Sequence, residues 1–384
     1  MQIVHVNLPH QPYKIIFSPG SIDTVGELLI TDLFQSRDLE QKVLIVSNPE
    51  IFQHYGQRVV KSLEKFGFNV SSIAIDAGER FKTFASIEKI YNAALEHRLE
   101  RSSTIIALGG GVVGDLAGFA ASTWLRGINL VQIPTSLLSM VDSAIGGKTG
   151  FNHPQGKNLI GTFYQPNLVI VDRDVLATLP SKEFRSGLAE IIKYGVIWDA
   201  SLFKQLEFAD SLQPTDIHPE LLEFMLTSSC QAKADIVVRD EKESDFGLRV
   251  LLNYGHTIGH AIESITNYCQ YTHGEAVALG MVAAGDIAVA SGWWTRGEAQ
   301  RQRTLIKKAG LPTSIPKIIE ITKILDKMAL DKKVKNGKVR FILPTGIGKA
   351  EITEQVNAEF TIQCLLKMQS SNSPSLNNSS LAFV

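Results

Sequence analysis

Short apolar runs rich in β-branched residues alternate with amphipathic stretches along the first half of the chain. Such runs predict buried strands at residues 42–48, 69–76, 104–108, 130–134 and 168–172. Helical periodicity occupies two of the intervening stretches, at about residues 51–66 and 84–96. Because strands that are apolar throughout are typical of a sheet covered on both faces, the pattern predicts a largely parallel sheet in an α/β domain.

The pattern changes after about residue 179. Long helical periodicities dominate residues 181–308, and a short strand is predicted at residues 338–343. A chain of 384 residues also exceeds the usual size of a single core. We therefore predict a Rossmann-like α/β domain at 1–180 and a mainly α-helical domain at 181–368, followed by a Ser/Asn-rich, disordered tail at 369–384.

Charge and cysteine usage exclude several classes of function. The 38 basic and 39 acidic residues give a net charge of −1, which argues against a surface for nucleic acid or anionic membranes. Cys230, Cys269 and Cys364 form no CxxC pair, so they predict neither a disulfide framework nor a thiolate zinc site. The apolar stretches 102–122 and 275–294 each contain an aspartate, which is costly in a bilayer, and no signal peptide is visible. We therefore expect a cytoplasmic protein without a membrane span.

Gly109, Gly111 and Gly114 form the pattern G-x-G-x-x-G directly after a predicted strand and before a predicted helix. In that context glycines let the backbone approach a pyrophosphate, and the helix N-terminus offers unpaired N–H donors. A tight structural turn would use the same glycines, and the acidic residue that usually follows about 20 residues later is missing. Polar groups at other strand ends, Asn48 and Glu79, indicate a dinucleotide pocket unlike an ordinary Rossmann site.

Two lysines, Lys148 and Lys157, stand in glycine-rich segments that we expect to be loops, close to Asp142. Such segments resemble phosphate cradles, although the spacing of a P-loop is absent. Solvated surface lysines are the alternative interpretation.

His256 and His260 stand four residues apart, so both imidazoles are expected on one helical face. His273 follows after a short loop, and Glu190 is an acid within an otherwise apolar helical stretch. Glu190, His256 and His273 would supply three N/O ligands and leave positions open, which is typical of a catalytic divalent site. Hydrogen-bonded core histidines are the alternative. The zincin motif is excluded, because Thr257 occupies the position of its catalytic glutamate.

Together these segments resemble the 3-dehydroquinate synthase family over about residues 10–360, in consistent order. The blocks that carry the resemblance are 109–121, 132–138, 141–158, 179–194, 251–263, 273–276 and 331–333. The resemblance implies an NAD- and metal-dependent phosphorus–oxygen lyase of the shikimate pathway, which supplies aromatic amino acid biosynthesis. Its substrate would be 3-deoxy-D-arabino-heptulosonate 7-phosphate. Transient oxidation, β-elimination of phosphate, re-reduction and aldol closure would give 3-dehydroquinate. A homodimer is also implied.

The resemblance also assigns roles to individual positions. The ligands of zinc or cobalt would be Glu190, His256 and His273. The NAD site would be lined by Asn48, Glu79, Lys82, Gly110, Gly111, Val112, Asp115, Thr135, Ser136, Asp142, Lys148, Lys157, Asn158, Thr178 and Glu183. The substrate would be held by Arg126, Lys148, Asn158, Lys193, Lys233, Arg249, Asn253, His260 and Lys332, with Arg126 reaching in from the neighbouring subunit. Catalysis would involve Lys148, Lys193, Asp142, His260 and Asn253.

Two extra residues separate Glu243 from Gly247 relative to the family pattern, so we leave Glu243 out of the predicted site. Sister cyclases that use sedoheptulose 7-phosphate, which lacks a carboxylate, tend to carry proline in the segment of His260 and to lose the Gly-Leu-Arg run. The presence of His260 and Arg249 favours the carboxylate-bearing substrate. A metal-dependent polyol dehydrogenase would differ in its glycine cluster and ligand order, and a non-enzymatic scaffold would require a broken ligand set.

Overall fold

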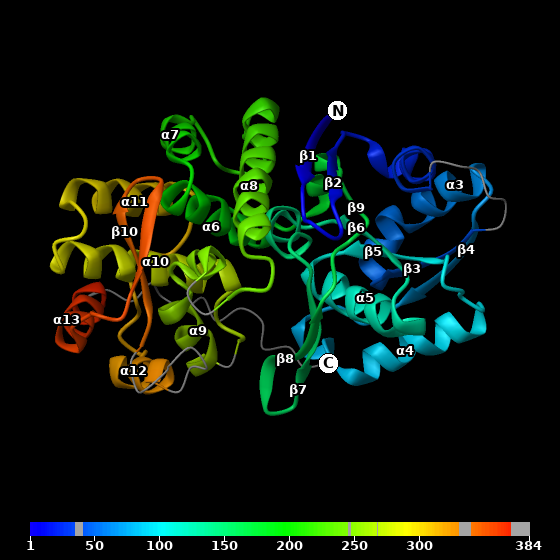
Figure 1. Ribbon diagram of the computed structural model, residues 1–384. Helices are drawn as coiled ribbons and strands as arrows, with labels where there is room; N and C mark the ends of the chain where they lie inside the picture. The colour runs from blue at the N-terminus through cyan, green and yellow to red at the C-terminus, as the bar shows by residue number, and fades with distance from the viewer. Residues whose placement is uncertain (35–40, 245–246, 267, 330–338, 370–384) are drawn as a thin grey trace, which may run out of the picture. The chain divides into compact units, whose positions relative to one another are not determined.

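A computed structural model describes residues 1–34, 41–244, 247–266, 268–329 and 339–369 of the chain. The chain forms two compact units (Figure 1). The first unit consists of Met1–Ile191 and Gln213–Arg249, and the second of Ile192–Leu212 and Val250–Val384. Lys332 and residues 370–384 of the predicted tail lie outside the described residues. The domain boundary predicted at residue 180 stays a prediction.

A seven-stranded sheet forms the centre of the first unit, in the order β1-β2-β9-β6-β5-β3-β4. Its strands are β1 (Gln2–Val6), β2 (Tyr13–Phe17), β3 (Lys42–Ser47), β4 (Asn69–Ala74), β5 (Thr104–Gly109), β6 (Asn129–Pro134) and β9 (Leu168–Val171). Every neighbouring pair is parallel except β1 and β2, which are antiparallel. The predicted α/β class with a largely parallel sheet is confirmed, but the edge strand β1 and its neighbour β2 were not predicted.

Helices connect and cover these strands. The helical elements are η1 (Ser21–Thr24), α1 (Val25–Leu28), η2 (Leu29–Phe34), α2 (Pro49–Ile51), η3 (Phe52–Gly56), α3 (Gln57–Lys65), η4 (Glu79–Phe81), α4 (Phe84–Glu96), α5 (Gly111–Thr123), η5 (Trp124–Arg126), η6 (Ser139–Ser143), η7 (Arg173–Thr178), α6 (Ser181–Ile197) and α8 (Pro219–Arg239). The short helix η8 (Leu248–Asn253) runs from the first unit into the second. On one face of the sheet, Leu44 and Ile105 pack with Ile90 of α4 and Leu116 of α5. The alternate residue Ile45 is equally buried, so the other face is covered as well.

The segment around Lys148 forms a hairpin. Strands β7 (Lys148–His153) and β8 (Gly156–Phe163) pair antiparallel, so the expectation that Lys148 and Lys157 lie on loops is wrong. The glycines serve close strand packing instead. A Cβ on Gly150 would lie 2.2 Å from the carbonyl oxygen of Ile160, which leaves room for glycine alone.

The second unit is mainly helical, as predicted, and the later part of α6 belongs to it. Its other helices are α7 (Ala200–Phe208), α9 (His256–Ile265), α10 (His273–Ala290), α11 (Arg296–Lys308), α12 (Ile321–Ala329) and α13 (Ala358–Met368). Strands β10 (Phe341–Gly346) and β11 (Lys349–Thr353) form an antiparallel pair, close to the strand predicted at 338–343.

Helix α10 is the most apolar helix of the second unit. Among the described residues it alone is long and apolar enough to cross a membrane, with a mean hydropathy of 1.2. However, 72% of it is buried inside the protein, which is typical of a core helix.

Candidate active site

The glycine cluster forms a turn between β5 and α5, as predicted. Gly109 ends the strand, and Gly110 is the N-cap of α5. Thr135 donates its backbone N–H to the carbonyl oxygen of Gly109 (3.0 Å), and a Cβ on Gly110 would lie 3.6 Å from the Ser136 hydroxyl. The turn therefore presents bare backbone beside two hydroxyl-bearing residues at the start of a 13-residue helix. Such a surface fits an approaching pyrophosphate.

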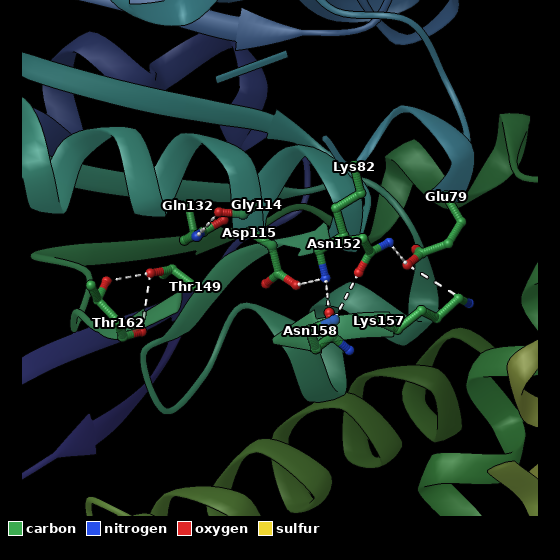
Figure 2. A network of polar contacts seen from close by, with 10 residues as sticks. All are labelled: Glu79, Lys82, Gly114, Asp115, Gln132, Thr149, Asn152, Lys157, Asn158 and Thr162. Atoms are coloured by element: carbon green, nitrogen blue, oxygen red, sulfur yellow. Dashed lines mark hydrogen bonds and ion pairs between the residues drawn. The ribbon is translucent and has the colours of Figure 1, made fainter. Parts of the chain in front are cut away.

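A polar cluster lies beside this turn (Figure 2). Lys82 donates to Asp115 (2.5 Å) and to Asn158 (2.6 Å), although it is only 5% exposed. Asn152 accepts from the backbone N–H of Asn158 (2.8 Å) and donates to Glu79 (2.8 Å). Nζ of Lys157 lies 3.7 Å from Oε1 of Glu79, with which it forms an ion pair. The structure thus brings together five of the residues predicted to bind the cofactor, namely Glu79, Lys82, Asp115, Lys157 and Asn158.

Two opposing effects act on the pKa of the Asp115 carboxyl in this polar cluster. Burial raises the pKa of the Asp115 carboxyl above its usual 3.8, while the Lys82 ammonium opposes this increase. The pair holds a positive and a negative charge in one partly dehydrated place. It can therefore orient hydroxyl groups of a bound ligand without carrying net charge.

Three further predicted residues of the first unit have anionic or carbonyl partners. Lys233 donates to the Asp142 carboxylate (2.6 Å), and Lys148 forms an ion pair with Glu243. Arg249 is buried and donates to the carbonyl oxygens of Gly146 (2.7 Å) and Glu241. Burial lowers the pKa of the Arg249 guanidinium.

The histidines of the second unit are grouped by two packed helices. His256 begins α9 after Gly255, whose φ of 78° lies in the left-handed region. A Cβ on Gly280 of α10 would lie 1.8 Å from the Gly255 carbonyl oxygen, so the two helices approach through glycine. His256 lies 5.2 Å from both His260 and His273, measured between ring centroids.

The histidine and carboxylate ligands predicted for a metal lie together. Glu190 is fully buried on α6, and His273 is the first residue of α10. Glu190, His256 and His273 each offer one ligand atom, and these atoms lie within 4.8 Å of one another. One carboxylate and two imidazoles are donors suited to a divalent transition metal, so the residues present fit such an ion.

The orientation of His256 is set by its neighbours. Its Nδ1 lies 3.0 Å from the carbonyl oxygen of Tyr254. Because a carbonyl only accepts, Nδ1 carries the proton and Nε2 is left to bind an ion. The Tyr254 hydroxyl donates to Gln302 on α11 (2.6 Å), which itself donates to the Met281 carbonyl oxygen on α10 (2.9 Å).

The other predicted site residues belong to several different elements. Asn48 caps α2 by accepting from the backbone N–H of Ile51 (2.8 Å), and Thr178 shares a hydrogen bond with Tyr55 (2.6 Å). Arg126 is exposed, in a turn with φ 70°. The rest are placed by element only: Val112 in the first turn of α5, Glu183 in the first turn of α6, Lys193 buried on α6, and Asn253 at the end of η8.

Two residues of these clusters were missed by the sequence prediction. Asn152 lies on β7, and only the register of the hairpin brings it to Asn158. Glu263 lies seven residues after His256 on α9, with its carboxylate 3.5 Å from His273. Helical spacing could have found Glu263, whereas no sequence signal marks Asn152.

Comparison with known proteins covers nearly the whole chain. Residues 72–186 match the family described as 3-dehydroquinate synthase N-terminal, and residues 187–334 match 3-dehydroquinate synthase C-terminal. A protein of Nostoc punctiforme named 3-dehydroquinate synthase is 58% identical, over 95% of this chain and 99% of its own length. One of Rippkaea orientalis with the same name is 60% identical, over 93% of this chain and 96% of its own.

Solved structures of similar fold include two cyclases. The structure of 2-deoxy-scyllo-inosose synthase with carbaglucose-6-phosphate, NAD⁺ and Co²⁺ has a TM-score of 0.85 at 25% identity, covering 96% of this chain and 100% of the other. The 2-epi-5-epi-valiolone synthase of Streptomyces hygroscopicus with NAD⁺ and Zn²⁺ has a TM-score of 0.82 at 27% identity, covering 94% and 98%.

Proposed function

Because the chain belongs to the 3-dehydroquinate synthase family, we propose that it converts 3-deoxy-D-arabino-heptulosonate 7-phosphate to 3-dehydroquinate and phosphate. The observation that carries this proposal is the grouping of Glu190, His256 and His273 in a chain whose relatives share this name. The substrate carries a carboxylate and a phosphate, which matches the many cations placed near carboxylate partners on a chain of net charge −1.

The chain contains residues suited to bind both the dinucleotide cofactor and the metal ion of such a reaction. The bare turn at Gly109–Gly111 and the polar cluster around Lys82 would hold NAD, and the carboxylate and two imidazoles would hold zinc or cobalt. When bound, these groups supply a reversible hydride acceptor and a Lewis acid for the C5 alcohol of the substrate. Oxidation at C5 would acidify the neighbouring C6 proton, so that phosphate could leave by β-elimination. Re-reduction, ring opening and an intramolecular aldol step would then complete the product.

The protein's own side chains orient the substrate and stabilise charge. Lys148 and Lys193 would stabilise the developing alkoxide and enolate, because a fixed ammonium needs no reorganisation during the reaction. Asp142, Asn253 and His260 would position hydroxyl groups and move protons. Lys233, Arg249 and Asn158 would hold the anionic ends of the substrate.

Two further expectations, on the oligomeric state and on the location in the cell, accompany this function. We propose a homodimer in which Arg126, exposed at a turn of the first unit, contacts the phosphate bound by the neighbouring subunit. We also propose a cytoplasmic location, with which the three free cysteines agree. Light scattering during size exclusion tests the first of these expectations, because a monomeric mass at working concentration would contradict it.

The test of function is phosphate release from the heptulosonate phosphate in the presence of zinc and a small amount of NAD. We expect many phosphates released for each NAD, with no accumulation of NADH, because the hydride returns in every turnover. NADH that accumulates in proportion to product would indicate a polyol dehydrogenase. Turnover of sedoheptulose 7-phosphate in preference to the acid would indicate a sister cyclase.

A further inference from the structure

We propose that Glu263 is a positioning residue that orients His273 and increases the affinity of the ligand group for its divalent ion. This inference rests on the proposed function, because it concerns the ion that the function requires. It assigns a role to a carboxylate that belongs to neither the predicted ligands nor the predicted substrate contacts.

The geometry that carries the proposal lies within the second unit. Glu263 is on α9, one turn after His260 and two turns after His256, so the three side chains share one face of the helix. Its Oε2 lies 3.5 Å from Nδ1 of His273, at the start of α10. Ligand atoms of His260, Glu263 and His273 all lie within 4.8 Å of one another.

The contact favours one of the two ring nitrogens of His273 for binding the ion. An ionised carboxylate only accepts hydrogen bonds, so it favours the ring proton on the Nδ1 that faces it. Nε2 then keeps its lone pair for the metal. His256 reaches the same tautomer through the Tyr254 carbonyl oxygen, 3.0 Å from its Nδ1. One imidazole is therefore oriented by the main chain and the other by a side chain.

A buried glutamate such as Glu263 is uncommon unless its carboxylate has a structural or functional role. Glu263 is 8% exposed, and an ionised carboxylate at such a place is costly without a compensating partner. Its negative charge faces an imidazole that becomes strongly polarised when a divalent ion binds at the opposite nitrogen. The charge therefore stabilises the ion-bound state more than the free state, which is an increase in affinity.

The experiment compares Glu263→Ala and Glu263→Gln with the wild type in two measurements that need no substrate. Zinc affinity is measured by competition with a chromophoric chelator, and the tautomer of His273 in the metal-free protein by ¹⁵N NMR of the ring. Asp286→Asn is the matched control. It makes a carboxylate-to-amide change on the helix that carries His273, at a side chain paired with Arg303.

We expect Glu263→Ala to weaken zinc binding by about 10- to 100-fold and to mix the two tautomers of His273. Glu263→Gln should keep the Nδ1–H tautomer, because its amide oxygen still accepts, and should lose part of the affinity with the charge. Asp286→Asn should bind zinc as the wild type does. Urea unfolding of each variant identifies losses of zinc affinity that come from unfolding alone. If the alanine variant does not fold, the zinc affinity and the His273 tautomer of the glutamine variant test the proposal.

Unchanged zinc affinity and an unchanged His273 tautomer in Glu263→Ala would overturn the proposal. A second zinc equivalent that disappears in Glu263→Gln would also overturn it, because Glu263 would then be a ligand. Zinc binding that follows our expectation in a protein that releases no phosphate from the heptulosonate phosphate would contradict the proposed function and leave this inference standing.

Discussion

The polar cluster around Lys82 and the histidine group of α9 and α10 hold their side chains in different ways. In the first, side chains are held by contacts with one another. Lys82 is fixed by Asp115 and Asn158, and Glu79 by Asn152. In the second, imidazoles project from two helices that approach through glycine, and the main chain orients His256.

The difference matches what each group would hold. A nucleotide offers many hydroxyl and phosphate oxygens, and rearrangeable ion pairs can exchange partners with them. A metal ion demands ligands at set positions, so its residues are fixed by backbone geometry and outer hydrogen bonds. A substitution in the polar cluster should therefore act mainly by leaving a buried charge without its partner. A substitution in the histidine group should act mainly by changing the backbone geometry that places the imidazoles.

The largest expected effect is that of His256→Ala. Loss of one of the two proposed imidazole ligands should abolish zinc binding and lower turnover on the order of 10³-fold, while the circular dichroism spectrum stays that of the wild type. His218→Ala, at an exposed histidine of the first unit, is the control. Full turnover by a His256→Ala protein that contains no metal would refute the ligand assignment.

Breaking the buried pair of the polar cluster should come next. Lys82→Met leaves the Asp115 carboxylate without its cation, which should lower the free energy of unfolding by about 3 kcal/mol at neutral pH. Burial already raises the pKa of Asp115, and loss of Lys82 should raise it further. The folded state then binds its proton more tightly than the unfolded chain. The lost stability should therefore return as the pH falls toward the usual aspartate pKa of 3.8.

Urea unfolding between neutral pH and pH 4 checks this sign. The double variant Lys82→Met with Asp115→Asn removes both charges and should recover most of the stability with little pH dependence. A Lys82→Met protein that becomes less stable as the pH falls would show that Asp115 is not the group that matters.

A glycine comparison tests how far backbone geometry sets the histidine group. Gly255 and Gly292 have similar positive φ values, 78° and 74°, but a Cβ on Gly255 would lie 2.9 Å from the Val277 carbonyl oxygen, whereas Gly292 has nothing within 4 Å. Gly255→Ala should cost about 3 kcal/mol of stability and weaken zinc binding, and Gly292→Ala about 1 kcal/mol with zinc binding unchanged. Equal costs from thermal unfolding, with equal zinc affinities, would contradict the role assigned to helix packing.

The smallest expected effect is that of Tyr254→Phe. It removes the hydrogen bond to Gln302 (2.6 Å) and leaves a buried amide oxygen with one donor fewer, which should cost about 1 kcal/mol of stability. Zinc affinity should fall only slightly, because the carbonyl oxygen that orients His256 remains. Tyr271→Phe, at a half-buried tyrosine of the same unit, is the control. A loss of zinc affinity as large as that of His256→Ala would mean that the hydroxyl, and not the main chain, orients the ligand.

The period of the hydrophobic residues and the spacing of the polar ones predicted much of this architecture. Strands β3 to β6 and helix α4 follow from apolar runs and 3.6-residue periodicity, and the pairing of His256 with His260 follows from their spacing. The hairpin at Lys148 did not, because glycines that permit close strand packing look like loop glycines in a sequence. Strand register, which brings Asn152 to Asn158, and the approach of α9 to α10, which brings His273 to Glu263, depend on contacts that no local pattern encodes.

The central claim, that a sugar acid phosphate is oxidised and then reduced again within one turnover, is tested most directly with substrate deuterated at C5. With NAD present at far less than one equivalent of substrate, we expect phosphate release to run to completion and the deuterium to remain in the product. Deuterium that accumulates in the cofactor, or product that forms at full rate when NAD has been removed, would contradict the account.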